Sequence, residues 1–257
     1  MHKDSIQRTL LVAFLLCVVC SVVVASSAVL LAPVQQANQL LDKRKNILVA
    51  AGLAKPKGLT ADKVDQLFEN IELKGVDLAT GQYVDVKANY SYQDATKDEN
   101  TSRALSQEAD LADIRRIPNV MPVYLAKASD GKVEKIILPV HGYGLWSTLY
   151  GFLALESNAN TVVGLGFYQH GETPGLGGEV DNPKWKAQWP GKKVYENDEP
   201  IVELVKGGVD VNTAKAEYKV DALSGATLTS RGVTNLLRFW LGDNGYGPFL
   251  KQFRNKA

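Results

Sequence analysis

The chain opens with a long run of apolar positions that has no counterpart in the rest of the sequence. Residues Thr9–Val34 are almost wholly apolar, and no charged residue occurs between Thr9 and Leu41. Twenty-six helical residues span about 39 Å, which exceeds the ~30 Å hydrocarbon core of a bilayer. The small residues Ser26–Ala28 resemble a signal-peptide cleavage site, but the apolar part of a signal peptide is normally only about 7–15 residues long. The pattern therefore favours a retained transmembrane helix.

Alternating apolar segments after this run predict β-hairpins. Segments 71–78 and 82–88 flank a short turn, segments 123–128 and 132–140 flank the Asp130-Gly131 turn, and segments 149–157 and 161–169 flank "NAN". An Asp-Gly pair between alternating apolar segments is a strong hairpin signal. Two further strands are expected within 200–208 and 217–223, whereas the polar stretch 91–110 predicts a surface excursion.

Helical spacing marks both ends of the chain. Residues 35–54 are expected to continue as a helix, which "KPKG" breaks. Near the C-terminus, apolar residues recur at positions i, i+3, i+4, i+7 and i+8 of one amphipathic helix, namely Val233, Leu236, Leu237, Trp240 and Leu241. The expected fold class is α+β, with a single N-terminal transmembrane helix and one mixed domain. We divide the chain into 1–34 (membrane helix), 35–120 (helical connector and α/β extension) and 121–257 (main domain).

Composition and charge exclude several kinds of function. The chain carries 29 basic and 28 acidic residues, and this balance gives no electrostatic footprint for nucleic acid. Cys17 and Cys20 have C-x-x-C spacing, but they lie in the apolar run, where two small apolar residues of a membrane helix are the simpler interpretation. The three histidines are too scattered for a zinc motif, so no metal is expected.

The sequence contains no Rossmann or P-loop glycine motif, so it signals no nucleotide site of either kind. Three stretches of the second half are candidates for holding a ligand, and the first two are rich in glycine. "HGYGLWSTLYG" (141–151) places Tyr143, Trp146 and Tyr150 among glycines, with Ser147 and Thr148 as polar donors. A flat heteroaromatic ring needs such a wall, although core aromatics at a strand corner would give the same pattern. "HGETPGLGGEV" (170–180) adds the side chains of Glu172 and Thr173 to a glycine-rich loop, whose alternative interpretation is an ordinary surface loop.

The stretch "DALSGATLTS" (221–230) is the most specific of the candidates. Thr227 lies just before a helix that we expect to begin near Leu228–Ser230, and helix N-termini favour anions such as phosphate. A threonine hydroxyl without an adjacent base is a poor nucleophile, so Thr227 suits modification better than catalysis and no catalytic residue is expected. The plain alternative is a helix capped by Ser or Thr after a tight turn.

This stretch resembles the flavinylation motif of bacterial flavoproteins. The order of the three stretches is also similar to the FMN-binding domain of the C subunit of the Na+-translocating NADH:quinone reductase, over essentially the whole chain. The resemblance implies that a flavin transferase joins the phosphate of FMN to Thr227 and reads Asp221, Ser224, Gly225 and Ala226. It further implies that two segments enclose the flavin ring, through Trp146, Ser147, Thr148, Leu149, Glu172, Thr173 and Leu176.

The resemblance also implies a location and a role. The N-terminus is expected in the cytoplasm and the domain on the periplasmic side of the bacterial inner membrane, a topology that the flanking charges leave open. The chain is expected to relay single electrons between redox centres of neighbouring subunits, while the complex carries electrons from NADH to ubiquinone and translocates Na+. The resemblance also implies that the chain has no NADH site of its own.

Three alternatives remain open. The equivalent subunit of the related ferredoxin:NAD electron-transport complex has a similar motif but is usually shorter, so the additional residues 55–115 favour the NADH:quinone reductase. A non-redox binding module anchored to the membrane would carry an unmodified Thr227. A free-standing flavoenzyme would need an acid or base, for which His170 and Glu172 are the candidates, neither with an evident partner in the sequence.

Overall fold

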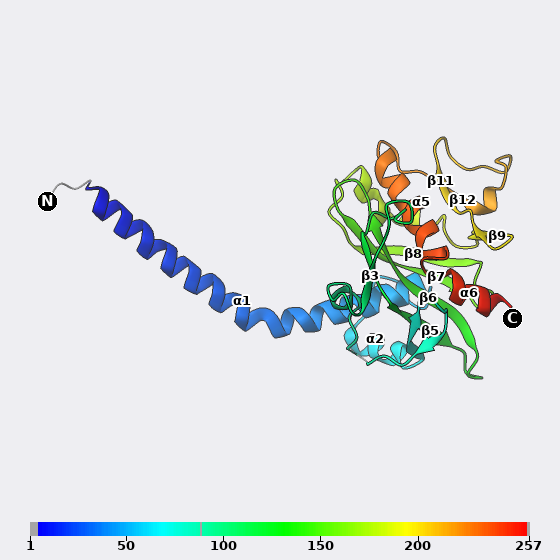
Figure 1. The fold of residues 1–257 in the computed structure, drawn as a ribbon, viewed down its shortest axis with the longest axis horizontal. Helices are drawn as coiled ribbons and strands as arrows, with labels where there is room; N and C mark the ends of the chain where they lie inside the picture. Colours follow the sequence, from blue (N-terminus) through cyan, green and yellow to red (C-terminus); the bar gives the residue numbers. More distant parts are fainter. Residues whose placement is uncertain (1–4, 88, 256–257) are drawn as a thin grey trace. The chain divides into compact units, whose positions relative to one another are not determined.

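The computed structural model describes residues 5–87 and 89–255 (Figure 1). Contacts divide the chain into two units, one extending to Lys43 and one from Arg44 onward. Helix α1 (Ile6–Ala50) forms the first unit and ends in the second. It is long and apolar enough to cross a membrane, and it continues through most of the predicted extension 35–54. Cys17 and Cys20 are free thiols on this helix.

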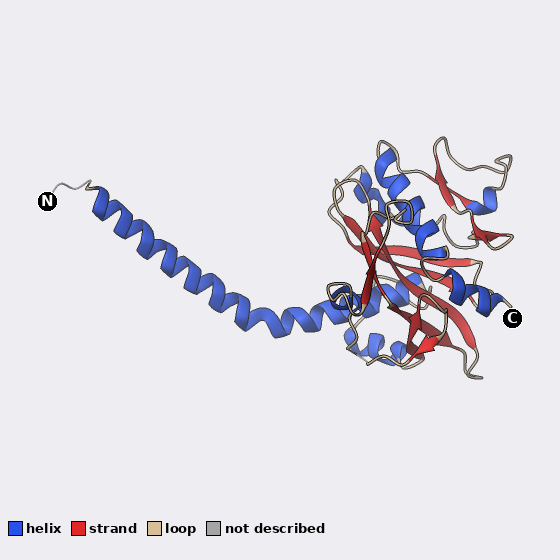
Figure 2. Ribbon diagram, in the orientation of Figure 1, coloured by secondary structure: helices blue, strands red, loops and turns tan. Residues whose placement is uncertain are grey.

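A six-stranded antiparallel sheet is the centre of the second unit, in the order β2-β1-β5-β6-β7-β8 (Figure 2). Its strands are β1 (Ile71–Asp77), β2 (Tyr83–Val84), β5 (Val120–Lys127), β6 (Val133–Tyr143), β7 (Thr148–Glu156) and β8 (Val162–Gln169). The three predicted hairpins are confirmed as β1–β2, β5–β6 and β7–β8. The first has a much shorter second strand than predicted, and residue 88 of that segment lies outside the described residues.

The sheet joins segments on both sides of residue 120. Strand β1 pairs with β5 along its whole length, from Ile71 opposite Ala126 to Asp77 opposite Val120. The division that the sequence suggests at residue 120 therefore falls at the first residue of a central strand. By contacts, the chain from Arg44 onward forms one compact unit.

Helices cover both faces of the sheet (Figure 1). Helix α5 (Thr227–Leu241) packs on one face so closely that a Cβ on Gly142 would lie 2.5 Å from the Cβ of Leu236. On the opposite face, the carbonyl oxygen of Ala50 in α1 would lie 2.5 Å from a Cβ on Gly164. Side chains alternate between faces along β7, so the core has two apolar layers separated by the sheet.

Short elements surround this framework. They are α2 (Ala61–Phe68), α3 (Tyr92–Ala95), β3 (Ser102–Ala104), β4 (Arg116–Pro118), the 3-10 turn η1 (Gly177–Asp181), α4 (Pro183–Lys186), β9 (Tyr195–Glu196), β10 (Glu199–Pro200), β11 (Glu203–Val205), the 3-10 turn η2 (Ala216–Tyr218), β12 (Lys219–Asp221) and α6 (Gly247–Arg254). The expected strands in 200–208 and 217–223 are confirmed as β11 and β12, which pair in parallel.

The prediction of a surface excursion over 91–110 is wrong in part. Tyr92 is buried in the main core, and β3 pairs with β4. The stretch reads as polar because its one large core side chain is a tyrosine, whose ring is apolar although its hydroxyl counts as polar. Tyr92 in the core and Leu105 packed against it bring this otherwise polar segment against the domain.

His141 is a buried titratable group in the centre of an aromatic cluster. Its ring lies 5.5 Å from the ring of Tyr92 and 5.5 Å from the ring of Tyr150, between centroids, in stacked geometry. Its Nδ1 atom is buried without a hydrogen-bond partner among the described residues. Burial lowers the pKa of His141 to about 4, so the ring is neutral at physiological pH.

The stability of the domain is expected to fall as the pH drops from 6.5 towards 4. The unfolded chain takes up a proton on His141 in this window, whereas the folded chain does not, so acid favours unfolding. A pKa of about 4 instead of 6.5 corresponds to about 3 kcal/mol of lost stability at the acidic end. Urea unfolding at a series of pH values checks this, and His141→Phe is expected to flatten the dependence. An equal slope in the variant would assign it to other groups.

Candidate functional site

The motif 221–230 forms the turn that leads into α5. Gly225 has a φ of 70°, which favours glycine, and it reverses the chain immediately before the helix. The helix begins at Thr227, one residue earlier than the predicted start near Leu228–Ser230. Its N-cap residue is Ala226, which provides no side-chain cap. The alternative of a helix capped by Ser or Thr is therefore wrong.

The hydroxyl of Ser230 forms two hydrogen bonds to the backbone of the turn that precedes α5. It accepts a hydrogen bond from the N–H of Leu223 at 2.9 Å and donates to the carbonyl oxygen of Ala226 at 2.9 Å. Thr227 is exposed, and among the described residues no acceptor lies within hydrogen-bond distance of the N–H groups of residues 227, 228 or 229. Three free N–H groups at a helix N-terminus, together with the helix dipole, favour a bound anion.

A cavity of about 690 Å³ opens beside Thr227. It is lined by Leu204, Lys206, Gly207, Gly208, Asp221, Ala222, Leu223, Ser224, Gly225, Thr227, Ser230, Arg231, Thr234, Asn235 and Arg238. The structure thus brings together four of the five motif residues that the sequence singles out, and Ala226 lies buried next to them. Two of the lining residues, Lys206 and Arg231, are exposed cations that form no ion pair with any described residue.

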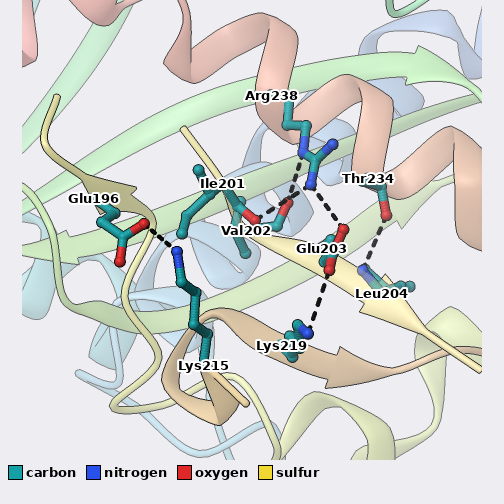
Figure 3. A network of polar contacts seen from close by, with 9 residues as sticks. All are labelled: Glu196, Ile201, Val202, Glu203, Leu204, Lys215, Lys219, Thr234 and Arg238. Atoms are coloured by element: carbon teal, nitrogen blue, oxygen red, sulfur yellow. Dashed lines mark hydrogen bonds and ion pairs between the residues drawn. The ribbon is translucent and has the colours of Figure 1, made fainter. Parts of the chain in front are cut away.

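Strand β11 contributes Leu204 to the lining of this cavity and is joined to α5 by polar contacts (Figure 3). The guanidinium of Arg238 donates to the carbonyl oxygen of Val202 at 3.1 Å and to the carboxylate of Glu203 at 2.9 Å. The hydroxyl of Thr234 accepts from the N–H of Leu204 at 3.0 Å, and Lys219 of β12 lies 3.7 Å from the other oxygen of Glu203. These contacts hold β11 against α5, so hydrogen bonds within the fold support the residues that line this side of the cavity.

Glu172 connects the second candidate stretch to the other two. Its Oε1 accepts hydrogen bonds from three consecutive backbone N–H groups, those of Leu145 (3.1 Å), Trp146 (2.9 Å) and Ser147 (3.2 Å). Its Oε2 accepts from the hydroxyl of Thr229 on α5 at 2.7 Å. Burial by itself raises the pKa of Glu172, but these four hydrogen bonds outweigh burial and leave the pKa below its ordinary value. The group is therefore an ionised carboxylate whose oxygens are already in use.

The remaining ring-side residues lie in different surroundings. Trp146 is 67% exposed, and Leu176 is 45% exposed and lies 3.0 Å from the position of a Cβ on Gly225. Thr173 is also exposed, and the hydroxyl of Ser147 accepts from the N–H of Gly171 at 2.6 Å. Leu176 is thus an apolar side chain beside the motif, and Trp146 is an exposed apolar side chain on the β6–β7 turn.

Three of the residues predicted to contact the flavin ring do not line the cavity beside Thr227. Tyr143 and Thr148 line another cavity, of about 720 Å³, together with His141. Leu149 is completely buried in the main core, so it has no surface exposed to a ligand. The period-2 alternation of β6 and β7 explains this arrangement, because neighbouring positions on a strand point to opposite faces.

The pair His170 and Glu172, which the sequence leaves without evident partners, has partners in the fold. The Nε2 atom of His170 lies 2.9 Å from the carboxylate of Asp181, and Glu172 is bound by Thr229. Both interactions hold the loop in place.

Sequence reasoning missed three residues at this site: Thr229, Lys206 and Arg231. Thr229 lies within the motif and Arg231 directly follows it, so their positions in the sequence could have indicated that they belong to the site. Lys206 stands before the Gly207-Gly208 pair, whose φ values are 99° and 85°, and only the fold places it in the same cavity lining as Thr227.

The fold and this site define a protein of the FMN-binding domain class, since a family model described as an FMN-binding domain matches residues 144–242. The chain is 52% identical to the C subunit of the Na+-translocating NADH-quinone reductase of Pseudomonas aeruginosa, over 98% of both chains. It is 48% identical to the corresponding subunit of Vibrio alginolyticus, over 99% of this chain and 97% of that relative. The crystal structure of NqrC from Shewanella oneidensis superposes with a TM-score of 0.75 at 32% identity, covering 83% of this chain and 97% of that one. The chain belongs to the family of C subunits of the Na+-translocating NADH-quinone reductase.

Proposed function

We propose that this chain is the subunit of a Na+-translocating NADH:quinone reductase that carries FMN covalently on Thr227 and relays electrons through it. The observation that carries the proposal is the exposed Thr227 hydroxyl, at the first residue of α5 and in the wall of a 690 Å³ cavity. The match of an FMN-binding domain model to residues 144–242 and the full-length relatives support it.

The residues of the site fit a flavin phosphate. An ester on Thr227 retains one negative charge, which the free N–H groups of the first turn of α5 and the cations Lys206 and Arg231 are suited to stabilise. The exposed side chains of Trp146 and Leu176 provide apolar surface for a flat ring. When bound, FMN supplies one-electron chemistry that no side chain of this chain provides.

Attachment to Thr227 is a phosphoryl transfer. The Oγ atom of Thr227 forms a bond to the phosphorus of the flavin phosphate, the bond from that phosphorus to the leaving group breaks, and the hydroxyl proton is released. A flavin pyrophosphate such as FAD satisfies this balance, with AMP as the leaving group. No base contacts Thr227 among the described residues, so activation is assigned to a flavin transferase.

The membrane anchor and the partners follow from the same proposal. Helix α1 crosses the bacterial inner membrane once, with the N-terminus in the cytoplasm and the domain on the periplasmic side. A covalent bond then keeps the flavin on a surface from which it would otherwise diffuse away. The neighbouring redox subunits of the reductase are the electron donor and acceptor. The full-length relatives carry the name of this reductase, which favours it over the ferredoxin:NAD complex.

Loss of the chain is expected to abolish Na+-stimulated oxidation of NADH by quinone in membranes of the host cell. The electron path through the complex is interrupted when one carrier is missing, and expression of the chain in a deletion strain should restore it. Oxygen uptake with NADH, measured with and without Na+, checks this. Membranes without the chain that retain Na+-stimulated activity would contradict the proposal, and loss of ferredoxin-dependent NAD reduction instead would support the related complex.

A further inference from the structure

Glu172 is the point at which three separate segments of the site meet. Its own loop follows β8, its Oε1 binds the backbone of the β6–β7 turn, and its Oε2 binds Thr229 in the first turn of α5. Ser147 and Thr229 lie 25 and 57 residues from Glu172 in sequence, so no local propensity holds the three segments together. A second link joins only two of them, from the N–H of Gly171 to the hydroxyl of Ser147.

The carboxylate of Glu172 has no room to move. A Cβ on Gly144 would lie 2.7 Å from Oε1, and a Cβ on Gly177 would lie 2.6 Å from Oε2 and 2.6 Å from the hydroxyl of Thr229. Real Cβ atoms essentially never approach so closely, so these two positions admit the carboxylate only because they are glycines. The side chain of Glu172 itself is 5% exposed.

The link to Thr229 bears directly on the acceptor threonine. Thr229 lies two residues after Thr227 in the same helical turn, and the N-cap Ala226 provides no side-chain cap to fix that turn. The hydrogen bond between Thr229 and Glu172 therefore links the first turn of α5 to the β6–β7 turn and the loop after β8, in addition to the close packing of Gly232 against Tyr143 further along the helix. The hydroxyl of Thr229 is fully buried, whereas Thr227 is exposed.

We propose that Glu172 is a positioning residue for flavin attachment: through Thr229 it presents the Thr227 hydroxyl of the already folded domain to the transferase. This inference rests on the proposed function. Phosphoryl transfer depends strongly on the alignment of the attacking oxygen, so a loosened first turn slows the reaction even though the Glu172 carboxylate forms no hydrogen bond with Thr227. The acceptor geometry exists only after folding, so folding precedes attachment.

The decisive test compares Thr229→Val, which keeps the shape and removes the hydroxyl, with Thr229→Ser, which keeps the hydroxyl. The full chain in detergent is incubated with a flavin transferase and FAD, and the rate of flavin attachment is measured by fluorescence on denaturing gels. We expect at least a tenfold slower rate for Thr229→Val and for Glu172→Gln, and a rate close to that of the native chain for Thr229→Ser. Glu179→Gln is the matched control, because Glu179 lies in the same loop but contacts Asn182 instead.

Hydrogen exchange of the unmodified chain provides a readout that does not depend on flavin. In Thr229→Val and Glu172→Gln, the amides of Leu145–Ser147, which donate to Glu172, and of Ser230, which donates to the carbonyl oxygen of Ala226, should exchange at least tenfold faster, while those of β7 stay protected. Equal attachment rates for Thr229→Val and the native chain would overturn the inference but leave the proposed function intact. A slower rate matched by lost protection in β7 would also overturn it, because the defect would then be general unfolding. A native chain that takes up no flavin would instead refute the proposed function.

Discussion

Replacing Thr227 by alanine is expected to remove the covalent flavin completely and to leave the domain folded. The side chain is exposed at the first residue of α5 and makes no hydrogen bond to any described residue, so its loss should change stability by less than about 0.5 kcal/mol. The neighbouring hydroxyls cannot take over, because Thr229 is fully buried and Ser230 is 3% exposed, and both are already hydrogen bonded.

Flavin fluorescence on a denaturing gel, after expression with a flavin transferase, is the measurement for this prediction. Thr227→Ser is the matched control, since it keeps a hydroxyl on the same backbone position and is expected to retain fluorescence. Thermal unfolding of Thr227→Ala should coincide with that of the unmodified native chain. A fluorescent band from Thr227→Ala would place the attachment elsewhere and refute the assignment of Thr227.

Replacing Gly232 by alanine is expected to destabilise the domain by about 2 kcal/mol. Helix propensity alone predicts the opposite sign, because alanine in a helix interior is favoured over glycine by about 1 kcal/mol. Sterics decide the outcome, since the new Cβ would lie 2.4 Å from the carbonyl oxygen of Tyr143 and 3.0 Å from Cα of Gly144. Both are backbone atoms of the β6–β7 turn, so α5 would have to move away from the sheet.

Urea unfolding of the chain in detergent measures this effect. Gly166→Ala is the control, because Gly166 lies in β8 with nothing within 4 Å of the methyl group that alanine would add, and its change is expected to be neutral or slightly stabilising. A gain in stability for Gly232→Ala would show that α5 and the β6–β7 turn are not packed as closely as described.

Local patterns in the sequence were sufficient for most of the elements. The three hairpins and helix α5 follow from alternation and from the i, i+3, i+4 spacing of residues such as Val233 and Leu237, because these periods record which side chains are buried. The place of Thr227 at a helix N-terminus was likewise predictable from the motif, within one residue.

Contacts between distant segments were beyond sequence reasoning. Nothing local in β1 indicates that it pairs with β5 rather than only with β2, and this pairing makes the chain from Arg44 onward one unit. Glu172 could be singled out as a polar residue in a glycine-rich loop, but its partner Thr229 lies 57 residues away. The register of β6 and β7 decides which face of the sheet Tyr143 and Leu149 occupy. A pattern of mixed apolar and glycine residues does not determine this register.

The site also explains why a redox domain would expose apolar surface. Leu176 lies beside Gly225 of the motif and Trp146 is exposed on the β6–β7 turn, while the cations Lys206 and Arg231 line the cavity beside Thr227. In the proposed function, the first pair meets the ring and the second pair meets the phosphate. Each half of a flavin nucleotide thus has described surface of matching chemistry in this part of the domain.

The mass of the peptide that contains Thr227 is the sharpest test of covalent attachment at this residue. The full chain is produced together with a flavin transferase, digested and analysed by mass spectrometry with fragmentation. We expect a peptide heavier by one FMN less one water molecule, with the added mass localised on Thr227. An unmodified Thr227 peptide from a chain made alongside an active transferase, or a modification localised on another residue, would contradict it.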